Sequence, residues 1–506
     1  MEAIQQLRNI RLEKLRKLKE LGINPYSYNF DRSHLTREIV ENFSSLEKNE
    51  KQVSVAGRIM AIRESGKKAA FADLQDSSGK IQIYFRMDKL GEKKYEIFKL
   101  ADIGDIFGIK GVVFKTRTGE ITIFAEDIEI LAKTLRPLPV VKEKKVDGKS
   151  VFYDQFSDTD LRYRMRYVDL IVNPAVKNVF IKRSKIIESM RKFLTDRGYL
   201  EVETPILQPI YGGASARPFV TYHNALDMKL YLRIANELYL KRLIVGGFDG
   251  VFEFSKDFRN EGMDRMHNPE FTQMELYIAY HDYEFMMKLV EEMMYRIAIE
   301  VNNSPILKFQ GMEADLTPPW KRISLYDAIK DETGYELMNK TKEEIIEISE
   351  KLDVSIEKFW AKGKIVEEIF SECVEHKIIQ PTFITDFPIE ISPLAKKKRG
   401  NPQLTERFEQ YILGKEVANA FSELNDPIDQ KERFLDQMEQ LKAGDEEAQV
   451  LDEDYIMALE YGLPPTTGIG IGIDRLTMLF TDSPSIRDVI LFPHMRPIKK
   501  ETDDQL

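Results

Sequence analysis

Apolar and polar side chains alternate along several short runs between residues 53 and 131. A period of two is typical of β-strands that bury one face. Turn sequences such as DSSG at residues 76–79 separate the runs, and five runs in about eighty residues predict a small closed barrel. We therefore expect a β-barrel domain at residues 51–135.

The segments on either side of the predicted barrel have different patterns. Residues 1–50 begin with a basic helical segment that ends at Gly22 and Pro25, two residue types that terminate helices. A basic helix suits contact with RNA phosphates, and it is equally typical of a solvated surface. Residues 136–172 contain prolines and a basic run and predict a linker. Residues 173–506 mix helical and strand patterns and predict a larger α+β domain.

The most polar predicted strands of the larger domain belong to the stretch FRNEGMDRMHNPEFTQMELY, residues 258–277. We expect two antiparallel strands joined by a long loop, with charged and aromatic residues alternating onto one face. Burying these charges without partners would cost several kcal/mol each, so the face is expected to bind a ligand with anionic, aromatic and cationic groups. A solvated hairpin with salt bridges is the alternative. The residues of this face are Arg259, Glu261, Phe271, Glu275 and Tyr277.

Composition narrows the class of protein. The chain has 506 residues, of which 43% are hydrophobic and 31% charged, values typical of a soluble protein with more than one domain. Cys373 is the only cysteine, so disulfides within the chain are excluded. The net charge of −10 opposes nucleic-acid binding by the surface as a whole, although a local basic patch suffices. No run is apolar enough to span a membrane and the N-terminus is unlike a secretory signal, so we expect a cytoplasmic protein.

A predicted hairpin at residues 407–425 brings two carboxylates together. A turn at residues 413–414 pairs Glu409 with Ala418 and puts Glu409 and Glu416 on one face. Two carboxylates suit Mg²⁺, which takes few protein oxygens and keeps water and phosphate oxygens. The alternative is an exposed acidic surface of the sheet.

Glycines alternate in the sequence GIGIGIDRL near the end of the chain. Gly468, Gly470 and Gly472 leave one face of a strand bare, which permits the close approach of a ligand or another element. Asp474 is expected to cap the following helix and Arg475 to lie in its first turn. A cation there opposes the helix dipole, so Arg475 is expected to have an anionic partner.

Three stretches, in order, resemble the signature motifs of class II aminoacyl-tRNA synthetases. RKFLTDRGYLEVETPIL resembles the first motif, FRNEG with HNPEFTQMELY resembles the second, and GIGIGIDRLTML resembles the third. The sequences GGASARPF, ELYLKRL and FSELND further resemble those of the bacterial lysyl-tRNA synthetases. The resemblance covers nearly the whole chain, and the motifs are specific as a set.

The resemblance implies an α+β chain with an N-terminal OB-fold that binds the anticodon. A class II catalytic domain would follow, with an antiparallel sheet flanked by helices. Such enzymes use ATP to convert L-lysine to lysyl-adenylate and transfer the lysyl group to the 3′ end of tRNA(Lys), with Mg²⁺ as cofactor. The first motif would form a homodimer interface. The reaction needs no side-chain nucleophile, so catalysis would rest on positioning and charge stabilisation.

The resemblance also assigns roles to residues of this chain. Catalysis would depend on Arg259 and Arg475. ATP would be bound by Arg259, Glu261, His267, Phe271 and Arg475. Lysine would be bound by Gly213, Glu237, Arg259, Glu275, Tyr277, Asn419 and Glu423. Mg²⁺ would be held by Glu409 and Glu416. The anticodon would be contacted by Phe71, Gln82 and Glu120.

Some of these roles differ from what the plain patterns predict. Strict alternation puts Asn419 and Glu423 on the face opposite Glu416, so we predict a bulge or kink between Glu416 and Asn419. Phe71 is also a candidate for the barrel core, because barrel aromatics usually face inward. Glu237 lies in the first turn of a helix, where an acidic residue ordinarily compensates the dipole.

Related functions are the alternatives. The aspartyl and asparaginyl enzymes share the architecture, but Glu275 and Glu423 would repel aspartate. Paralogues that lysylate proteins lack the anticodon barrel, which argues against that function. A tRNA-binding regulator without catalysis is disfavoured because all three motifs keep their chemical residues.

Overall fold

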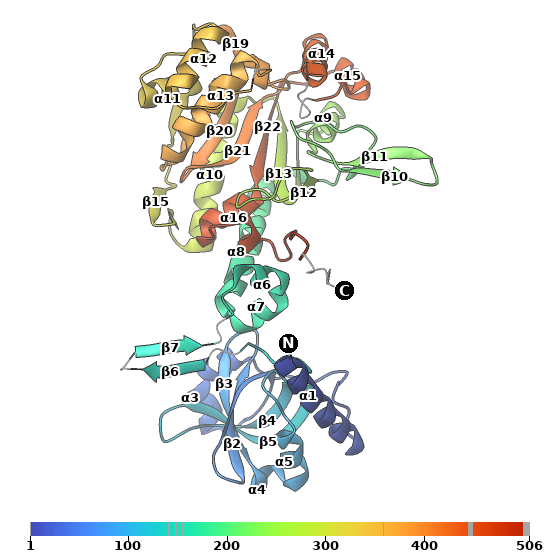
Figure 1. Cartoon of the computed structure of the whole chain (residues 1–506), viewed down its shortest axis with the longest axis vertical. Coiled ribbons are helices and arrows are strands. Elements are labelled where there is room, and N and C mark those ends of the chain that lie inside the picture. Colours follow the sequence, from blue (N-terminus) through green and yellow to red (C-terminus); the bar gives the residue numbers. More distant parts are fainter. Residues whose placement is uncertain are drawn as a thin grey trace, which may run out of the picture. The chain divides into compact units, whose positions relative to one another are not determined.

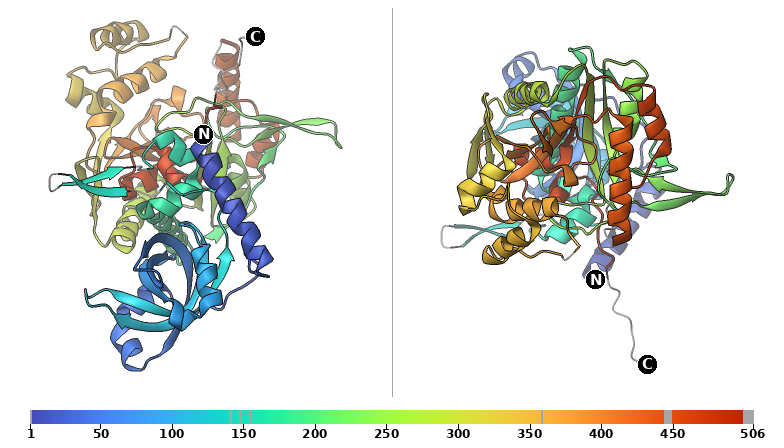
Figure 2. Two further views of the ribbon diagram at one scale, coloured as in Figure 1. Left: turned by 60° about the horizontal axis from the view of Figure 1, so that its bottom comes forward. Right: turned by 90° about the horizontal axis from the view of Figure 1, so that it is seen from above.

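The computed structural model describes residues 2–139, 142–146, 149–153, 156–357, 359–443 and 449–498. The chain divides into two compact units, one of Met1–Arg162 with Tyr167–Val172 and one of Tyr163–Arg166 with Asn173–Leu506 (Figure 1, Figure 2). Among the described residues, no helix is long and apolar enough to cross a membrane.

The first unit is built on a five-stranded barrel. Its strands are β1 (Gln52–Glu64), β2 (Ala69–Gln75), β3 (Lys80–Arg86), β4 (Ile106–Lys115) and β5 (Ile121–Ala132). They close in the order β1-β2-β3-β5-β4, with β3 and β5 parallel and the other neighbours antiparallel. Along β2, Ala70, Ala72 and Leu74 are buried in the barrel core. The small closed barrel predicted from the alternation is confirmed, and its five strands agree with the OB-fold that the resemblance implies.

Helices precede the barrel strands and lie between β3 and β4. The helices are α1 (Glu2–Glu20), α2 (Thr36–Glu41), α3 (Phe43–Lys48), α4 (Met87–Leu90) and α5 (Glu92–Lys99). The segment expected to be a linker also contains regular elements, namely β6 (Lys142–Val146), β7 (Lys149–Tyr153), α6 (Thr159–Arg164) and α7 (Arg166–Val172).

The second unit is organised around an eight-stranded sheet. In spatial order its strands are β16 (Lys321–Ser324), β17 (Thr382–Thr385), β20 (Arg407–Ile412), β21 (Lys415–Ser422), β22 (Thr466–Gly472), β13 (Glu270–Ala279), β12 (Gly250–Phe258) and β8 (Leu200–Glu201). Neighbours are antiparallel except for the outermost pairs, β16 with β17 and β12 with β8.

Helices and small hairpins surround this sheet, as predicted. The helices are α8 (Pro174–Thr195), α9 (Glu237–Val245), α10 (Tyr283–Asn302), α11 (Leu325–Thr333), α12 (Lys342–Lys351), α13 (Lys362–Cys373), α14 (Pro427–Ala443), α15 (Glu453–Glu460), α16 (Ile473–Thr481) and α17 (Ile486–Val489). The smaller strands are β9 (Leu207–Gln208), β10 (Val220–His223), β11 (Met228–Leu232), β14 (Ile306–Phe309), β15 (Met312–Asp315), β18 (Lys397–Lys398) and β19 (Asn401–Thr405).

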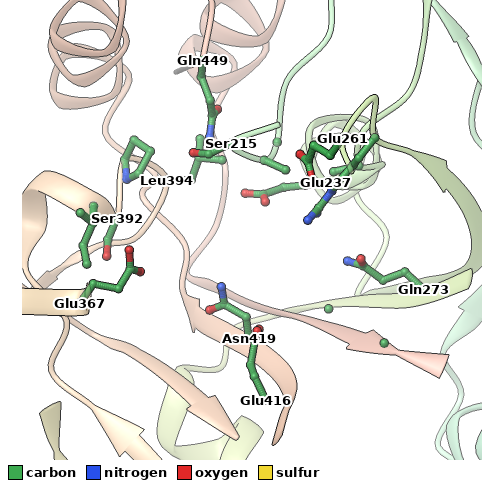
Figure 3. Close-up of a pocket in the computed structure, with 18 of the residues that line it drawn as sticks. Ser215, Glu237, Glu261, Gln273, Glu367, Ser392, Leu394, Glu416, Asn419 and Gln449 are labelled. Atoms are coloured by element: carbon green, nitrogen blue, oxygen red, sulfur yellow. The ribbon is translucent and has the colours of Figure 1, made fainter. Parts of the chain in front are cut away.

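The two faces of the sheet have different environments, and strand β13 shows both. Met274, Leu276 and Ile278 are buried in the hydrophobic core. Glu275 and Tyr277, which alternate with them, line a cavity on the opposite face, part of which is shown in Figure 3. The alternation predicted for this strand is confirmed, and it directs the charged face toward the cavity.

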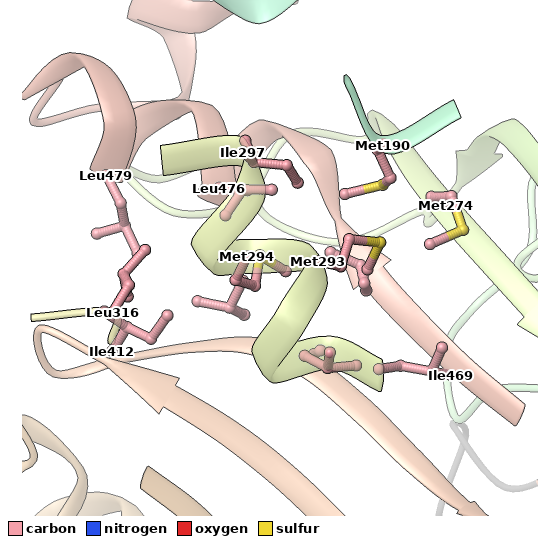
Figure 4. Close-up of a cluster of buried hydrophobic side chains, with 14 of the residues drawn as sticks. Met190, Met274, Met293, Met294, Ile297, Leu316, Ile412, Ile469, Leu476 and Leu479 are labelled. Carbon is pink, nitrogen blue, oxygen red and sulfur yellow. The ribbon is translucent and has the colours of Figure 1, made fainter. Parts of the chain in front are cut away.

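The core on the other face is formed by α8, α10 and α16 packed against the strands (Figure 4). Helix α10 is capped by Asp282, whose side chain accepts hydrogen bonds from two backbone N–H groups of the first turn. Methionines are prominent at this contact, where their unbranched side chains fill irregular space. They include Met190, Met274, Met293 and Met294.

Strand β12 is shorter than predicted. It ends at Phe258, so Arg259 and Glu261 lie in the loop that follows rather than on a strand face. The backbone N–H of Arg259 still donates to the carbonyl of Pro269 at 2.9 Å, and that of Asn260 donates to the carbonyl of Arg217 at 2.8 Å. Hydrogen bonds to two other segments therefore hold the loop just beyond the strand.

The predicted cap of helix α16 is wrong. The N-cap residue is Gly472, and Asp474 lies within the first turn. Its carboxylate accepts hydrogen bonds from the Arg183 guanidinium at 2.6 Å and from the Thr272 backbone N–H at 2.7 Å. Burial with a cation and an N–H donor from other elements outweighs a local cap. Arg475 does lie in the first turn, as predicted.

The hairpin of β20 and β21 contains the predicted bulge. Glu409 pairs with Asn419, and the ladder skips Val417, one residue beyond Glu416. The irregularity expected between Glu416 and Asn419 is therefore confirmed. The expected pairing of Glu409 with Ala418 is wrong, because the extra residue shifts the register by one.

Candidate active site

A cavity of about 870 Å³ lies on the polar face of the eight-stranded sheet. Its volume is within the usual range for small-molecule sites. Strands β13, β21 and β22 form part of it, together with the loop after β12 and the start of α9 (Figure 3). Eleven of the residues expected at the site line it: Gly213, Glu237, Arg259, Glu261, His267, Phe271, Glu275, Tyr277, Glu416, Asn419 and Arg475.

One part of the cavity combines a cation with an aromatic ring. The Arg259 guanidinium carbon lies 5.1 Å from the centroid of the Phe271 ring, within the range of a cation–π contact. The Nε atom of Arg259 is buried and has no hydrogen-bond partner among the described residues. Because buried donors are normally paired, this atom indicates a place for an anionic ligand. Glu261 is exposed in the neighbouring loop.

A second group of polar residues lies where the loop after β12 meets α16. Arg475 donates to Glu416 at 3.0 Å, so its anionic partner within the chain is a carboxylate. The other Arg475 nitrogen lies 3.3 Å from His267 Nε2, and His267 Nδ1 lies 2.8 Å from Asp264. With Asp264 as acceptor, Nδ1 carries the proton and Nε2 is free to accept. This group can bind phosphate oxygens through Arg475 and a reoriented or protonated His267.

The deepest part of the cavity is acidic. Glu275 accepts hydrogen bonds from the Gln273 amide at 2.9 Å and from the Tyr277 hydroxyl at 3.0 Å. Glu423 is buried beneath the lining, where its Oε2 forms an ion pair with Lys241 and its Oε1 has no hydrogen-bond partner among the described residues. Burial raises the pKa of both carboxyl groups. Buried carboxylates with spare acceptor capacity beside a hydroxyl suit a ligand ammonium group.

Two glycines allow these groups to come close together. A Cβ atom added to Gly468 would overlap Glu423 Oε1 and the Tyr277 ring. Only the bare strand face predicted from the glycine alternation leaves room for both side chains. Gly213 has a φ of +84°, and a Cβ there would lie 3.1 Å from the Cβ of Glu237. Glycine is thus required at both positions for steric or conformational reasons.

Two buried cations at the site were not singled out from the sequence. Arg407 donates to Asn419 Oδ1 at 3.1 Å and to Glu409 at 2.6 Å, which leaves the amide NH₂ of Asn419 as a free donor at the cavity. Lys241 forms ion pairs with Glu237 and Glu423. The available signals were spacings: Arg407 is two residues from Glu409 in one strand, and Lys241 is one helical turn from Glu237.

The residues expected to hold a metal are near one another but differ in exposure. Glu416 is half-buried and lines the cavity, while Glu409 lies below it and accepts a hydrogen bond from the Tyr411 hydroxyl at 2.7 Å. Burial, opposed by Arg407 and reinforced by Glu416, raises the pKa of Glu409 to about 7. The described residues contain no group of three or more side chains that would hold a metal alone. Two neighbouring carboxylates fit Mg²⁺ that is also bound by phosphate oxygens, once Arg475 has turned from Glu416 to the phosphates.

The expected anticodon residues lie on the barrel of the first unit. Phe71 is half-buried and stacks on Tyr84, with ring centroids 4.4 Å apart. It lies outside the barrel core, so the alternative of core packing is wrong. Gln82 accepts a hydrogen bond from the Thr122 hydroxyl at 2.9 Å. Glu120 is exposed just before β5.

The aromatic surface around Phe71 includes three rings that were not predicted from the sequence. Tyr84 also contacts Phe124 at 5.6 Å and Phe114 at 6.2 Å between ring centroids. All of these rings are half-buried. Such a platform is typical of OB-folds that stack single-stranded bases.

The catalytic sheet, its cavity and the barrel together define a class II aminoacyl-tRNA synthetase. The family described as tRNA synthetases class II (D, K and N) matches residues 158–496, and the OB-fold nucleic acid binding domain matches residues 53–131.

Proteins similar to this chain indicate which synthetase of the class it is. A lysine–tRNA ligase of Syntrophomonas wolfei is 54% identical over 98% of each chain. Another from Thermoanaerobacter pseudethanolicus is 56% identical over 98% of this chain and 97% of the relative, and one from Carboxydothermus hydrogenoformans is 54% identical over 98% and 99%. The chain belongs to the lysine–tRNA ligases of the class II synthetase family.

Proposed function

We propose that this chain activates L-lysine with ATP and transfers the lysyl group to the 3′ end of tRNA(Lys). The observation that carries the proposal is the acidic end of the cavity, where the carboxylates of Glu275 and Glu423 lie beside the hydroxyl of Tyr277. A substrate with a side-chain ammonium satisfies these groups, whereas an acid or an amide leaves at least one buried carboxylate without a cation.

In this proposal both ends of lysine are held. Glu275, Tyr277 and Glu423 bind the side-chain ammonium. The α-amino group binds Glu237 beside Gly213. The carboxylate binds Arg259 and the amide NH₂ of Asn419, which Arg407 keeps oriented toward the cavity. Each charged group of the amino acid thereby has an oppositely charged partner or a hydrogen-bond donor.

ATP occupies the other part of the cavity. Its adenine ring stacks on Phe271, and its exocyclic amino group donates to Glu261. Arg259 contacts the α-phosphate, while His267 and Arg475 bind the distal phosphates. On phosphate binding, Arg475 exchanges its contact with Glu416, which is partly exposed, for one with the nucleotide.

The chemical step then requires only alignment. A carboxylate oxygen of lysine attacks the α-phosphorus, the bond to the β-phosphate oxygen breaks, and pyrophosphate leaves. Arg259 holds the nucleophile and the α-phosphate in one plane with its guanidinium fork. It also stabilises the negative charge that builds up on the phosphorus oxygens, because its position is fixed by the Phe271 ring. A ribose hydroxyl of the tRNA then attacks the lysyl carbonyl and releases AMP.

Glu409 and Glu416 are the residues that would hold Mg²⁺. When bound there, the ion would neutralise phosphate charge. The nearness of the two carboxylates supports this assignment, since a divalent cation would relieve the repulsion between them.

The barrel would recognise the anticodon loop. Unpaired bases are read by stacking on aromatic rings and by hydrogen bonds to their edges. Phe71 and its aromatic neighbours would supply the stacking. Gln82 would supply hydrogen bonds, with Glu120 at the border of the surface.

We assign the regions as an N-terminal helical segment (residues 1–50), an anticodon-binding domain (51–135), a linker (136–172) and a catalytic domain (173–506). The family relationship favours a cytoplasmic homodimer formed through the first motif. Exposed apolar residues support a dimer, including Ile181 on α8, which is 53% exposed. Light scattering on the purified protein measures the mass of the assembly.

The decisive experiment is aminoacylation of purified tRNA(Lys) with lysine, aspartate and asparagine in parallel. Charging with lysine alone is expected. Charging with aspartate or asparagine would identify one of the related enzymes. Lysine-dependent ATP–pyrophosphate exchange without tRNA charging would favour lysylation of another acceptor, and the absence of both activities would indicate a tRNA-binding regulator.

A further inference from the structure

Lys241 is a fully buried cation in the wall of the amino-acid site. It lies in α9, one turn after Glu237, and its side chain has no exposed surface. Its ammonium forms ion pairs with Glu237 and with Glu423, which comes from the segment after β21. It also lies 5.3 Å from the Phe421 ring centroid and 5.9 Å from that of Tyr277. Lys241 also interacts with the buried Tyr455, so it joins the wall of the cavity to the core behind it.

The two neighbouring carboxylates explain why Lys241 stays protonated although it is buried. Burial alone would lower the pKa of Lys241, but Glu237 and Glu423 outweigh this effect and raise it, so the side chain is charged. Without it, Glu237 and Glu423 would face each other as buried like charges. Repulsion between such groups in a low-dielectric site is severe, and it separates or protonates them.

The two carboxylates that Lys241 joins have different tasks in the proposed function. Glu237 binds the α-amino group and Glu423 the side-chain ammonium. One Glu423 oxygen, Oε1, faces the bare strand at Gly468 and is not used by Lys241. Lys241 therefore ties together groups that contact opposite ends of the same substrate.

We propose that Lys241 is a positioning residue that sets the spacing between Glu237 and Glu423, and so selects the chain length of the diamino acid. The inference rests on the proposed function. Lysine matches the spacing, whereas ornithine, which is one methylene shorter, reaches one carboxylate at the expense of the other. Without the bridge the spacing between the two carboxylates is no longer fixed, so lysine binding weakens and the carboxylates can adjust to the shorter substrate.

The test compares Lys241→Met and Lys241→Gln with the wild-type enzyme in ATP–pyrophosphate exchange. The ratio of kcat/KM for lysine to that for ornithine is expected to fall about tenfold or more, the scale of discrimination that one methylene provides. The KM for lysine should rise while the KM for ATP changes less than about threefold. The Gln variant keeps a hydrogen-bond donor, which protects the measurement if the Met variant does not fold.

Lys340→Met is the matched control. Lys340 pairs with Glu344 over the same spacing of four residues at 2.9 Å, but on the surface, where the two side chains are 42% and 45% exposed. The Lys340→Met variant is expected to leave the ratio of kcat/KM for lysine to that for ornithine unchanged. A folded Lys241 variant with the wild-type ratio, or one that loses ATP and lysine binding equally, would overturn the inference. Failure of the wild-type enzyme to use lysine would instead overturn the proposed function.

Discussion

Gly468→Ala is expected to remove most lysine binding and to leave the ATP site largely intact. The added Cβ overlaps Glu423 Oε1 and the Tyr277 ring. The strand cannot move away, because β22 is paired with β13 on one edge and β21 on the other. Glu423 and Tyr277 must therefore shift. Removing one partner of a buried ion pair costs about 3–5 kcal/mol, which corresponds to roughly two to three orders of magnitude in affinity.

The assay is lysine-dependent ATP–pyrophosphate exchange, with the KM for lysine and for ATP measured separately. Gly470→Ala is the comparison, because its Cβ would meet the flexible amide end of Gln273 at 2.5 Å and Glu275 Cγ only at 3.8 Å. Its KM for lysine is expected to change about tenfold or less. If Gly468→Ala has a normal melting curve and a KM for lysine within about threefold of wild type, this end of the cavity does not bind the substrate side chain.

Three further predictions address other parts of the molecule. Arg259→Lys keeps the charge but not the planar fork, so exchange should fall to a small fraction of wild type, and a rate within about threefold would remove Arg259 from the mechanism. Phe71→Ala should leave exchange and the melting temperature near wild type but lower tRNA charging roughly ten- to a hundredfold, and unchanged charging would exclude Phe71 from the anticodon surface. Burial raises the pKa of Glu275 and Glu423, and an ammonium binds the ionised carboxylate. The KM for lysine should therefore rise as the pH falls and these carboxylates become protonated, and a KM independent of pH would contradict this.

The sequence by itself determined the elements whose pattern is local. Alternation along β2 and β13 identified their buried and exposed faces, because side chains of a strand point to opposite sides regardless of what covers them. The alternate glycines of β22 identified a bare strand face for the same reason. The motifs located most of the cavity lining, including Arg259 and Glu275, since those residue types are needed wherever the same ligands are bound.

Tertiary structure decided features that depend on residues far apart in the chain. Beyond the end of strand β12, Asn260 bonds to the distant Arg217. Asp474 pairs with Arg183 instead of capping its own helix. The ion pair between Lys241 and Glu423 joins residues 182 positions apart in the sequence, so only the fold shows it. A buried charge is stable only beside its partner. The local pattern of hydrophobic and polar residues does not show which distant residue that partner is.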